Sequence, residues 1–227
     1  MARVLVVVAH PDDEVLGCGG AMARHAAQGD RVHVFILGEG AMARHALPTG
    51  KGRREIERLR HAAQRAARIL GVHKLALEPF PDNRFDTVPL LELVKMVERV
   101  KARIRPETVY THHGGDLNVD HRRVHEAVLA ACRPQPGESV KRVFAFEVLS
   151  STEWGGTVGA GAFQPNWFVD ISKTLQKKLA ACRAYKTEFR RWPHPRSLEG
   201  VKVLAQQRGM SVGLRAAEAF MTIRHVS

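Results

Sequence analysis

The sequence predicts an α/β fold, a three-layer Rossmann-like arrangement with a mostly parallel central sheet and helices on both faces. Strand and helix patterns alternate from residue 3 to residue 149, which is typical of a parallel sheet with helical crossovers. The first apolar run, "VLVVVA", is continuous, as expected for a strand that is covered on both faces. We find no internal repeat and no linker, so residues 1–227 are expected to form a single domain.

The first 70 residues contain two strand patterns and two helix patterns. The apolar segments "RVLVVVA" and "RVHVFIL" are typical of strands. Between the second strand and the second helix the chain is rich in Gly, Ala and His, which indicates a loop. The second helix ends before Gly71, a residue that favours a left-handed helix cap. In order, these segments are strand 3–9, helix 13–28, strand 31–37, loop 38–52 and helix 53–70.

The alternation continues through the middle of the chain. The segment "PFPDNRFDTVP" has three prolines and an Asp-Asn pair, so it is expected to be a loop. The next segment has apolar residues at helical spacing, and Pro106 precedes the strand "ETVYT". In order, we expect a weaker strand 74–78, loop 79–89, helix 90–104, strand 107–111, loop 112–120, helix 121–132 and strand 142–149.

The remainder of the chain departs from this alternation. Residues 151–167 are Gly-rich and are expected to fold over another part of the molecule. A helix over 172–189, the proline-flanked loop "WPHPRS", a helix over 198–209 and a last strand over 217–226 follow.

Composition limits the kinds of partner. The net charge of +12 attracts anions, but many arginines recur at helical spacing, which is typical of a solvated helix face. No nucleic-acid-binding motif occurs, so no specific nucleic acid is expected as a partner. No apolar run is long enough to cross a membrane. Three widely spaced cysteines without a CxxC pair indicate a reduced, cytoplasmic protein; its oligomeric state is open, and a homo-oligomer is compatible.

Two segments with dense His and Asp content are expected to meet. "AHPDDEVLGCGG" follows the first strand, and "HHGGDLNVDHRRVH" follows the fourth. With the usual strand order 3-2-1-4-5, ligands bind beyond the carboxyl ends of strands one and four. The two segments therefore lie in one predicted crevice, although about 110 residues separate them in the chain.

Histidine and carboxylate side chains in such a crevice favour a metal site. Two imidazoles and a carboxylate, with water in the open position, make a hydrolytic zinc site. A bound cation also compensates the adjacent acids. Helix capping alone explains Asp12 or Asp13 but not the second His-rich segment. A nucleotide-binding domain needs a glycine fingerprint where "HPDDEVLG" stands.

These two motifs resemble the LmbE/PIG-L family of zinc-dependent N-acetyl-sugar deacetylases, in the bacterial branch that reads Asp-x-Asn-x-Asp-His. The resemblance extends to "FPDNRFD", "EVLSSTEW" and the final "AEAF". It implies that His10, Asp13 and His121 bind Zn²⁺ and that Asp12 is the catalytic base. It also implies a small amino-sugar conjugate, with or without phosphate, as the substrate.

The sequence departs from better-studied branches at Asn118, where they carry a second histidine. An amide cannot titrate, so His113 or His194 is a candidate donor to the leaving amine. Arg60 falls near a substrate-facing arginine of the family. We expect water attack on the acetamide carbonyl, with Asp12 accepting the proton.

Other polar residues have two interpretations each. Asp120 is a catalytic candidate, or it supports a neighbouring metal ligand. Glu14 either supports the metal ligands through hydrogen bonds or has a purely structural role in the first turn of its helix. Asp116 and Asn118 bind sugar hydroxyls or fix the loop. Arg196 pairs with a substrate phosphate, or its loop is a packed connector. Two rival functions are an amidase for a non-sugar acyl amine and a non-catalytic module that binds a sugar nucleotide or nucleic acid.

Overall fold

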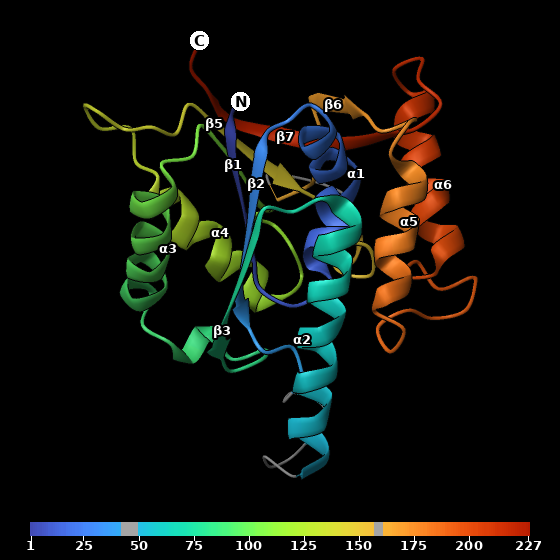
Figure 1. Cartoon of the computed structure of the whole chain (residues 1–227), viewed down its shortest axis with the longest axis horizontal. Coiled ribbons are helices and arrows are strands. Elements are labelled where there is room, and N and C mark those ends of the chain that lie inside the picture. Colours follow the sequence, from blue (N-terminus) through green and yellow to red (C-terminus); the bar gives the residue numbers. More distant parts are fainter. Residues whose placement is uncertain (42–49, 157–160) are drawn as a thin grey trace.

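The computed structural model describes residues 1–41, 50–156 and 161–227, and a seven-stranded sheet lies at its centre (Figure 1). The strands are β1 (Arg3–Val8), β2 (Arg31–Gly38), β3 (Lys74–Phe80), β4 (Thr108–His112), β5 (Arg142–Phe146), β6 (Trp167–Asp170) and β7 (Ala217–His225). Their order is β3-β2-β1-β4-β5-β7-β6. The first five run parallel; β7 is antiparallel to β5, and β6 is antiparallel to β7 and so runs in the direction of the first five. The predicted class and the order 3-2-1-4-5 are confirmed.

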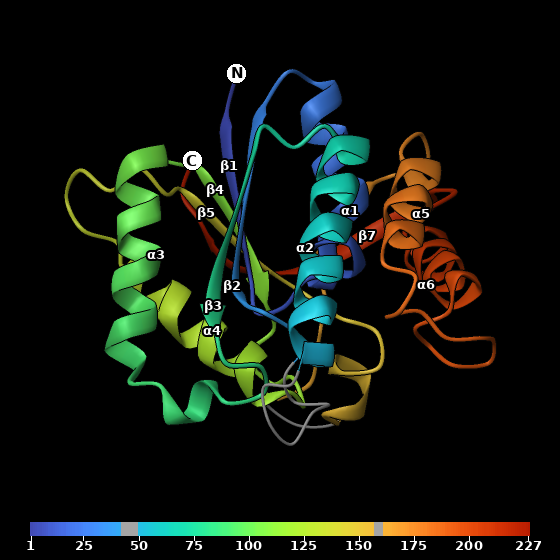
Figure 2. The ribbon, with the colours of Figure 1, turned by 60° about the horizontal axis from the view of Figure 1, so that its bottom comes forward.

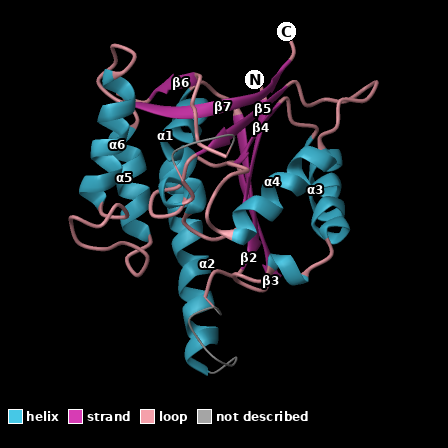
Figure 3. Ribbon diagram, turned by 180° about the vertical axis from the view of Figure 1, so that it is seen from behind, coloured by secondary structure: helices cyan, strands magenta, loops and turns pink. Residues whose placement is uncertain are grey.

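Helices cover both faces of this sheet (Figures 2 and 3). The helices are α1 (Asp13–Ala27), α2 (Gly50–Leu70), α3 (Leu90–Ile104), α4 (Val119–Ala131), α5 (Leu175–Ala184) and α6 (Leu198–Met210). Short 3₁₀ turns, η2 (Phe85–Thr87) and η3 (Thr152–Trp154), follow β3 and β5. Helices α3 and α4 lie on one face, and α1, α2, α5 and α6 lie on the other.

The apolar run of β1 is buried on both faces, which explains its lack of alternation. Val4, Val6 and Val8 face the core shared with α1 and α2. Leu5 and Val7 face the core beneath α3 and α4. All five side chains are fully buried, and each such burial stabilises the fold by about 1.5–3 kcal/mol. The strand that carries the active-site turn is therefore one of the most firmly held elements.

The structure differs from the predicted elements mainly near the C-terminus. The Gly-rich stretch was not predicted to end in a strand, yet β6 pairs with β7 at the sheet edge. Four residues are too few for a periodic signal. The helix predicted over 172–189 is wrong in length, because α5 spans only Leu175–Ala184. Strand β5 ends at Phe146 because the next turn uses other partners: the backbone N–H of Val148 donates to Thr152 Oγ1 (2.7 Å).

Differences elsewhere are shifts at element ends. Helix α2 begins at Gly50, inside the loop predicted over 38–52, and residues 42–49 of that loop lie outside the described part. His112 belongs to β4, and α4 begins at Val119 rather than at His121. Among the described residues, no helix is both long and apolar enough to cross a membrane.

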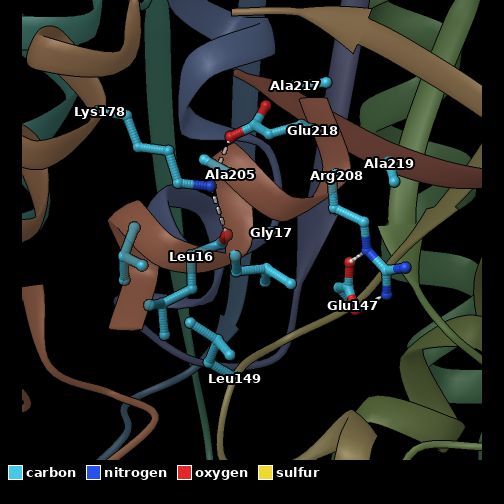
Figure 4. Close-up of a pocket in the computed structure, with 12 residues that line it drawn as sticks. Leu16, Gly17, Glu147, Leu149, Lys178, Ala205, Arg208, Ala217, Glu218 and Ala219 are labelled. Atoms are coloured by element: carbon cyan, nitrogen blue, oxygen red, sulfur yellow. Dashed lines mark hydrogen bonds and ion pairs between the residues drawn. The ribbon is translucent and has the colours of Figure 1, made fainter. Parts of the chain in front are cut away.

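Helix α1 has a kink that is held by a buried ion pair (Figure 4). Cys18 leaves the helical conformation (φ −144°, ψ 24°), which frees backbone N–H groups beyond it. Glu218 of β7 accepts from the N–H groups of Gly20 (2.8 Å) and Ala21 (2.7 Å). Lys178 Nζ pairs with Glu218 (2.5 Å) and donates to the Leu16 carbonyl (2.7 Å). The adjoining pocket, about 20 Å³, has room for a water molecule only.

Candidate active site

The two His- and Asp-rich segments meet at the carboxyl ends of β1 and β4, which are neighbouring parallel strands. His10 lies in the turn after β1, and Asp12 and Asp13 lie at the start of α1. His121 lies in the first turn of α4. The rings of His10 and His121 are 5.5 Å apart between centroids. The two segments therefore meet, as predicted from the order of elements.

Three side chains offer ligand atoms to a common point. One ligand atom from each of His10, Asp13 and His121 lies within 4.8 Å of the other two, and all three residues are buried. Asp13 Oδ2 is the centre of this group, at 3.4 Å from His10 Nδ1 and 3.3 Å from His121 Nε2. Two imidazoles and one carboxylate form a ligand set that suits Zn²⁺ and leaves a position for water. The residues present therefore fit a zinc ion.

The charges of this group also fit a cation. Burial opposes ionisation, but the neighbouring His121 and His112 hold the pKa of Asp13 well below its usual range. Asp13 in turn raises the pKa of His121 to about 9, against the effect of burial. A buried carboxylate held ionised between imidazoles is a group that attracts a cation.

Two further carboxylates lie next to the other ring nitrogen of His10. Its Nε2 lies 2.8 Å from Asp120 Oδ2 and 3.3 Å from Asp82 Oδ1. Asp120 also accepts from the backbone N–H groups of Asn83 (2.6 Å) and Phe85 (2.9 Å). These bonds occupy the Asp120 carboxylate, so it orients the ring of His10 and the loop after β3. The geometry favours the supporting interpretation of Asp120 over the catalytic one.

His121 is oriented in the same way by Asp116. Its Nδ1 lies 3.1 Å from Asp116 Oδ1. Asp116 is buried and accepts from the hydroxyls of Ser151 and Thr152, each at 2.5 Å. Asn118 caps α4, with its side-chain oxygen accepting from the Asp120 N–H (2.8 Å). For Asp116 and Asn118 the structure favours the loop-fixing alternative over contact with a sugar.

Asp12, the residue before the ligand Asp13, has an unusual backbone conformation. It is the N-cap of α1, and its φ of 111° lies in the left-handed region. Arg196 Nη1 lies 3.1 Å from Asp12 Oδ2. Burial raises the pKa of Asp12 well above its usual range, and the Arg196 guanidinium opposes that rise. The Asp12 carboxylate is thus held in place by a cation from the distant "WPHPRS" loop.

Glu14 supports Asp12 from behind. The Asp12 backbone N–H donates to Glu14 Oε2 (3.0 Å), and Tyr185 donates its hydroxyl proton to Glu14 Oε1 (2.5 Å). Burial raises the pKa of Glu14 to about 7, although the Tyr185 bond lowers it. Glu14 therefore shapes the turn that presents Asp12.

The remaining predicted residues lie around this centre or outside it. His113 Nε2 bonds to the Gly161 carbonyl (2.8 Å). His194 Nδ1 accepts from the Arg196 N–H (3.0 Å), and its ring meets Trp154 edge-on. Arg60 is exposed on α2, where it acts electrostatically on Glu39. Among the described residues, none of these three shows a contact with the ligand group His10, Asp13 and His121.

Sequence reasoning missed three buried participants. Asp82 stands in "FPDNRFD", which was noted only for its resemblance to the family. His112 lies 3.5 Å from Asp13 Oδ2, and its ring stacks on that of His121 at 3.9 Å. Tyr185 is far away in the chain, and no local pattern marks it. The prolines around Asp82 and the paired histidines at 112 and 113 were the available signals.

The sheet order and the His–Asp group at its switch point define an α/β protein of Rossmann-like architecture with a candidate metal-dependent active site. The chain belongs to the PIG-L family, described as GlcNAc-PI de-N-acetylase, whose model matches residues 5–132. The predicted family is therefore confirmed.

Relatives of this chain carry different names. It is 32% identical to 4-oxalmesaconate hydratase of Pseudomonas putida over 84% of this chain and 75% of that protein. It is 29% identical to a 1D-myo-inositol 2-acetamido-2-deoxy-alpha-D-glucopyranoside deacetylase of Saccharopolyspora erythraea (84% and 78%). It is 27% identical to the uncharacterized deacetylase YaiS of Escherichia coli (81% and 90%). The family as represented here thus includes both deacetylases and a hydratase.

Solved structures agree with this assignment. The conserved protein TT1542 from Thermus thermophilus is 29% identical, with a TM-score of 0.78 over 100% of this chain and 97% of that one. The 4-carboxy-2-hydroxymuconate hydratase from Pseudomonas putida is 26% identical, with a TM-score of 0.74 over 100% and 98%. The whole described fold is therefore similar to that of its relatives.

Proposed function

We propose that this protein is a metal-dependent N-deacetylase that removes an acetyl or related acyl group from an amino sugar or its glycoconjugate. The observation that carries the proposal is the convergence of ligand atoms of His10, Asp13 and His121 within 4.8 Å of one another. Asp12, the residue before Asp13 in the chain, is buried and pairs with Arg196. The deacetylase names of several relatives support the same class of reaction.

His10, Asp13 and His121 would hold the metal, with zinc as the proposed ion. When bound, zinc supplies Lewis acidity that lowers the pKa of water and polarises a carbonyl oxygen. Asp120 and Asp82 fix the ring of His10, and Asp116 fixes the ring of His121. Such carboxylate partners orient ligand imidazoles and make them more basic.

Asp12 acts as the base in this proposal. It accepts one proton from the attacking water, whose oxygen bonds to the acyl carbon. The C–N bond breaks as Asp12 returns that proton to the nitrogen, so the products are a carboxylic acid and a free amine. Arg196 fixes the position of the buried Asp12 carboxylate and opposes the rise in its pKa that burial causes. Since Asp12 already engages Arg196, we assign Arg196 to the base and not to a substrate phosphate.

The test is a substrate screen with acetate release as the readout. The panel contains N-acetylglucosamine derivatives, including nucleotide- and lipid-linked ones, together with acyl amino acids as non-sugar amides. We expect release from the sugars that is abolished by a chelator and restored by zinc. Turnover of acyl amino acids alone would favour the amidase, and absence of any chelator-sensitive release would favour a binding module.

A hydratase is the second candidate, because the 32% identical relative carries that name. A polarising metal and a carboxylate base can also add water across an activated double bond. Incubation with 4-oxalmesaconate distinguishes the two, because its hydration removes a conjugated double bond and lowers ultraviolet absorbance. Hydration without acetate release from any sugar would replace the deacetylase proposal.

The three cysteines, Cys18, Cys132 and Cys182, are all free and buried. This arrangement supports our proposal that the enzyme works in a reducing compartment, the cytoplasm. A homo-oligomer stays a prediction, as does the single-domain organisation.

A further inference from the structure

The amino ends of three neighbouring strands carry positive charges. Arg3 begins β1, Arg31 begins β2 and Lys74 begins β3. In the sheet register Arg3 is paired with Arg31, and His33 is paired with Lys74. Like charges on adjacent positions of neighbouring strands repel each other, so this row favours an anion.

These side chains share one face of the sheet. Side chains alternate along a strand, and Leu5 and Phe35 belong to the core beneath α3. Arg3, Arg31 and His33 are at even spacing from these residues and therefore face the same side. The last turn of α3 adds Arg103. Together the two strand ends, Lys74 and α3 enclose an open groove of about 330 Å³.

The groove has a charged rim and an apolar floor. Val100 and Ile104 of α3 and Ala76 of β3 line it between the charged side chains. Its volume lies in the range of roughly 300–1,000 Å³ that is typical of small-molecule sites. Of the described residues that line it, none is Phe, Tyr or Trp, which argues against a stacking site for single-stranded nucleic acid.

The charges of the rim are not neutralised by the protein. Within the described part of the chain, no carboxylate lies within 4.0 Å of the charged groups of Arg3, Arg31, Lys74 or Arg103. His33 Nδ1 is buried and lacks a hydrogen-bond partner among the same residues. Burial, together with His73, Lys74 and Arg31, lowers the pKa of His33, as expected in a positive potential.

The groove is remote from the candidate active site. Arg3 and Val8 are the two ends of β1, which corresponds to a separation of roughly 17 Å, and His10 lies beyond Val8. In Figure 1 the amino end of β1 lies at the top, and the chain leaves its carboxyl end towards the bottom. A ligand in the groove is therefore separate from the substrate of the proposed reaction.

We propose that this groove binds an organic phosphate or diphosphate that carries apolar surface next to its phosphate groups. The guanidinium groups of Arg3, Arg31 and Arg103 suit bidentate contacts with phosphate oxygens, and Lys74 adds a point charge. The apolar floor contacts the remainder of the molecule. This site also explains part of the +12 charge, which the active site does not use.

The test is a fluorescence titration of the full chain with N-methylanthraniloyl-ADP, with a chelator present so that the metal site does not contribute. Three proteins are compared: the natural chain, the double variant Arg31→Glu/Arg103→Glu, and a control, Lys177→Glu/Lys202→Glu. The control has the same net charge, and its two residues are exposed on α5 and α6. Melting temperatures confirm that each variant is folded, and the milder Arg31→Gln/Lys74→Gln replaces the first variant if it is not.

We expect saturable binding that the groove variant weakens by about tenfold or more, since two charge-assisted contacts with phosphate oxygens are replaced by repulsion. The control should stay near the natural affinity, and inorganic pyrophosphate should compete. Equal losses in both variants would mean general charge attraction and would overturn the site. No binding to the natural chain, or a duplex oligonucleotide that binds while pyrophosphate fails to compete, would also overturn it. Acetate release is unaffected by these variants, so failure here leaves the proposed reaction standing.

Discussion

Two clusters of buried charge touch α1, one at its first turn and one at its kink. At the kink, Glu218 is matched by Lys178 and by two backbone N–H groups. At the first turn, six carboxyl groups are buried: Asp12, Asp13, Glu14, Asp82, Asp116 and Asp120. Arg196 pairs with Asp12, and the imidazoles of His10 and His121 lie against Asp13, Asp116 and Asp120. The kink cluster holds one carboxylate against one cation and two N–H groups, whereas the first-turn cluster gathers several carboxylates around two imidazoles that can bind a metal.

We expect the largest effect when the proposed base in the first-turn cluster is replaced. Asp12→Asn keeps the size of the side chain, and Asn tolerates the left-handed φ of 111° at this position. We expect kcat to fall by about 10²–10⁴-fold, since Asn cannot accept the proton. Zinc content by elemental analysis should stay near that of the natural protein. Asp86→Asn, an exposed change in η2, is the control, and normal turnover in Asp12→Asn would refute the assignment.

A substitution in the kink cluster should lower the free energy of unfolding. Lys178→Met leaves Glu218 buried without its cation, and the loss of one partner of a buried pair costs about 3–5 kcal/mol. Urea denaturation measures the free energy of unfolding. Lys177→Met, the exposed neighbour on α5, should change it little. If both variants are equally stable, the ion pair does not hold α1 in place.

The first-turn cluster should gain stability from a metal. A ligand at one hundred times its Kd stabilises the folded state by about 2.7 kcal/mol. We therefore expect zinc to raise Tm and a chelator to lower it again. His121→Gln should abolish this response, while His125→Gln, at another histidine of α4, should retain it. A full equivalent of zinc in His121→Gln would exclude His121 as a ligand.

We expect the smallest effect, a shift of the pH profile, when Arg196 is replaced. Arg196→Gln removes the guanidinium that opposes the burial-raised pKa of Asp12, so this pKa should rise further. The base must be deprotonated, so the acid limb of the kcat/KM profile should move to higher pH. Activity should be lost most at low pH and recover as pH rises. Arg191→Gln, an exposed residue nearby, is the control; a uniform loss at every pH would instead indicate substrate binding.

The sequence predicted most of what depends on local pattern and on topology. Apolar strand patterns located β1 and β2, and the rule for parallel sheets brought His10 and His121 together. The residues that surround these ligands were harder to predict, because Asp82 and Tyr185 reach the site through tertiary packing. Strand β6 was missed since its four residues gain their structure from pairing with β7. Local signals predict elements, while buried polar networks are specified by the completed fold.

The contact between Glu218 and α1 links positions 198 and 197 residues apart in the chain. During synthesis the side chain that caps the second half of α1 emerges about 200 residues after the helix itself. We therefore expect nascent chains that stop before β7 to present Asp12 and Asp13 on an unanchored helix, with no zinc retained. Synthesis of β7, rather than the appearance of the motif, would then decide when the proposed active site first becomes competent.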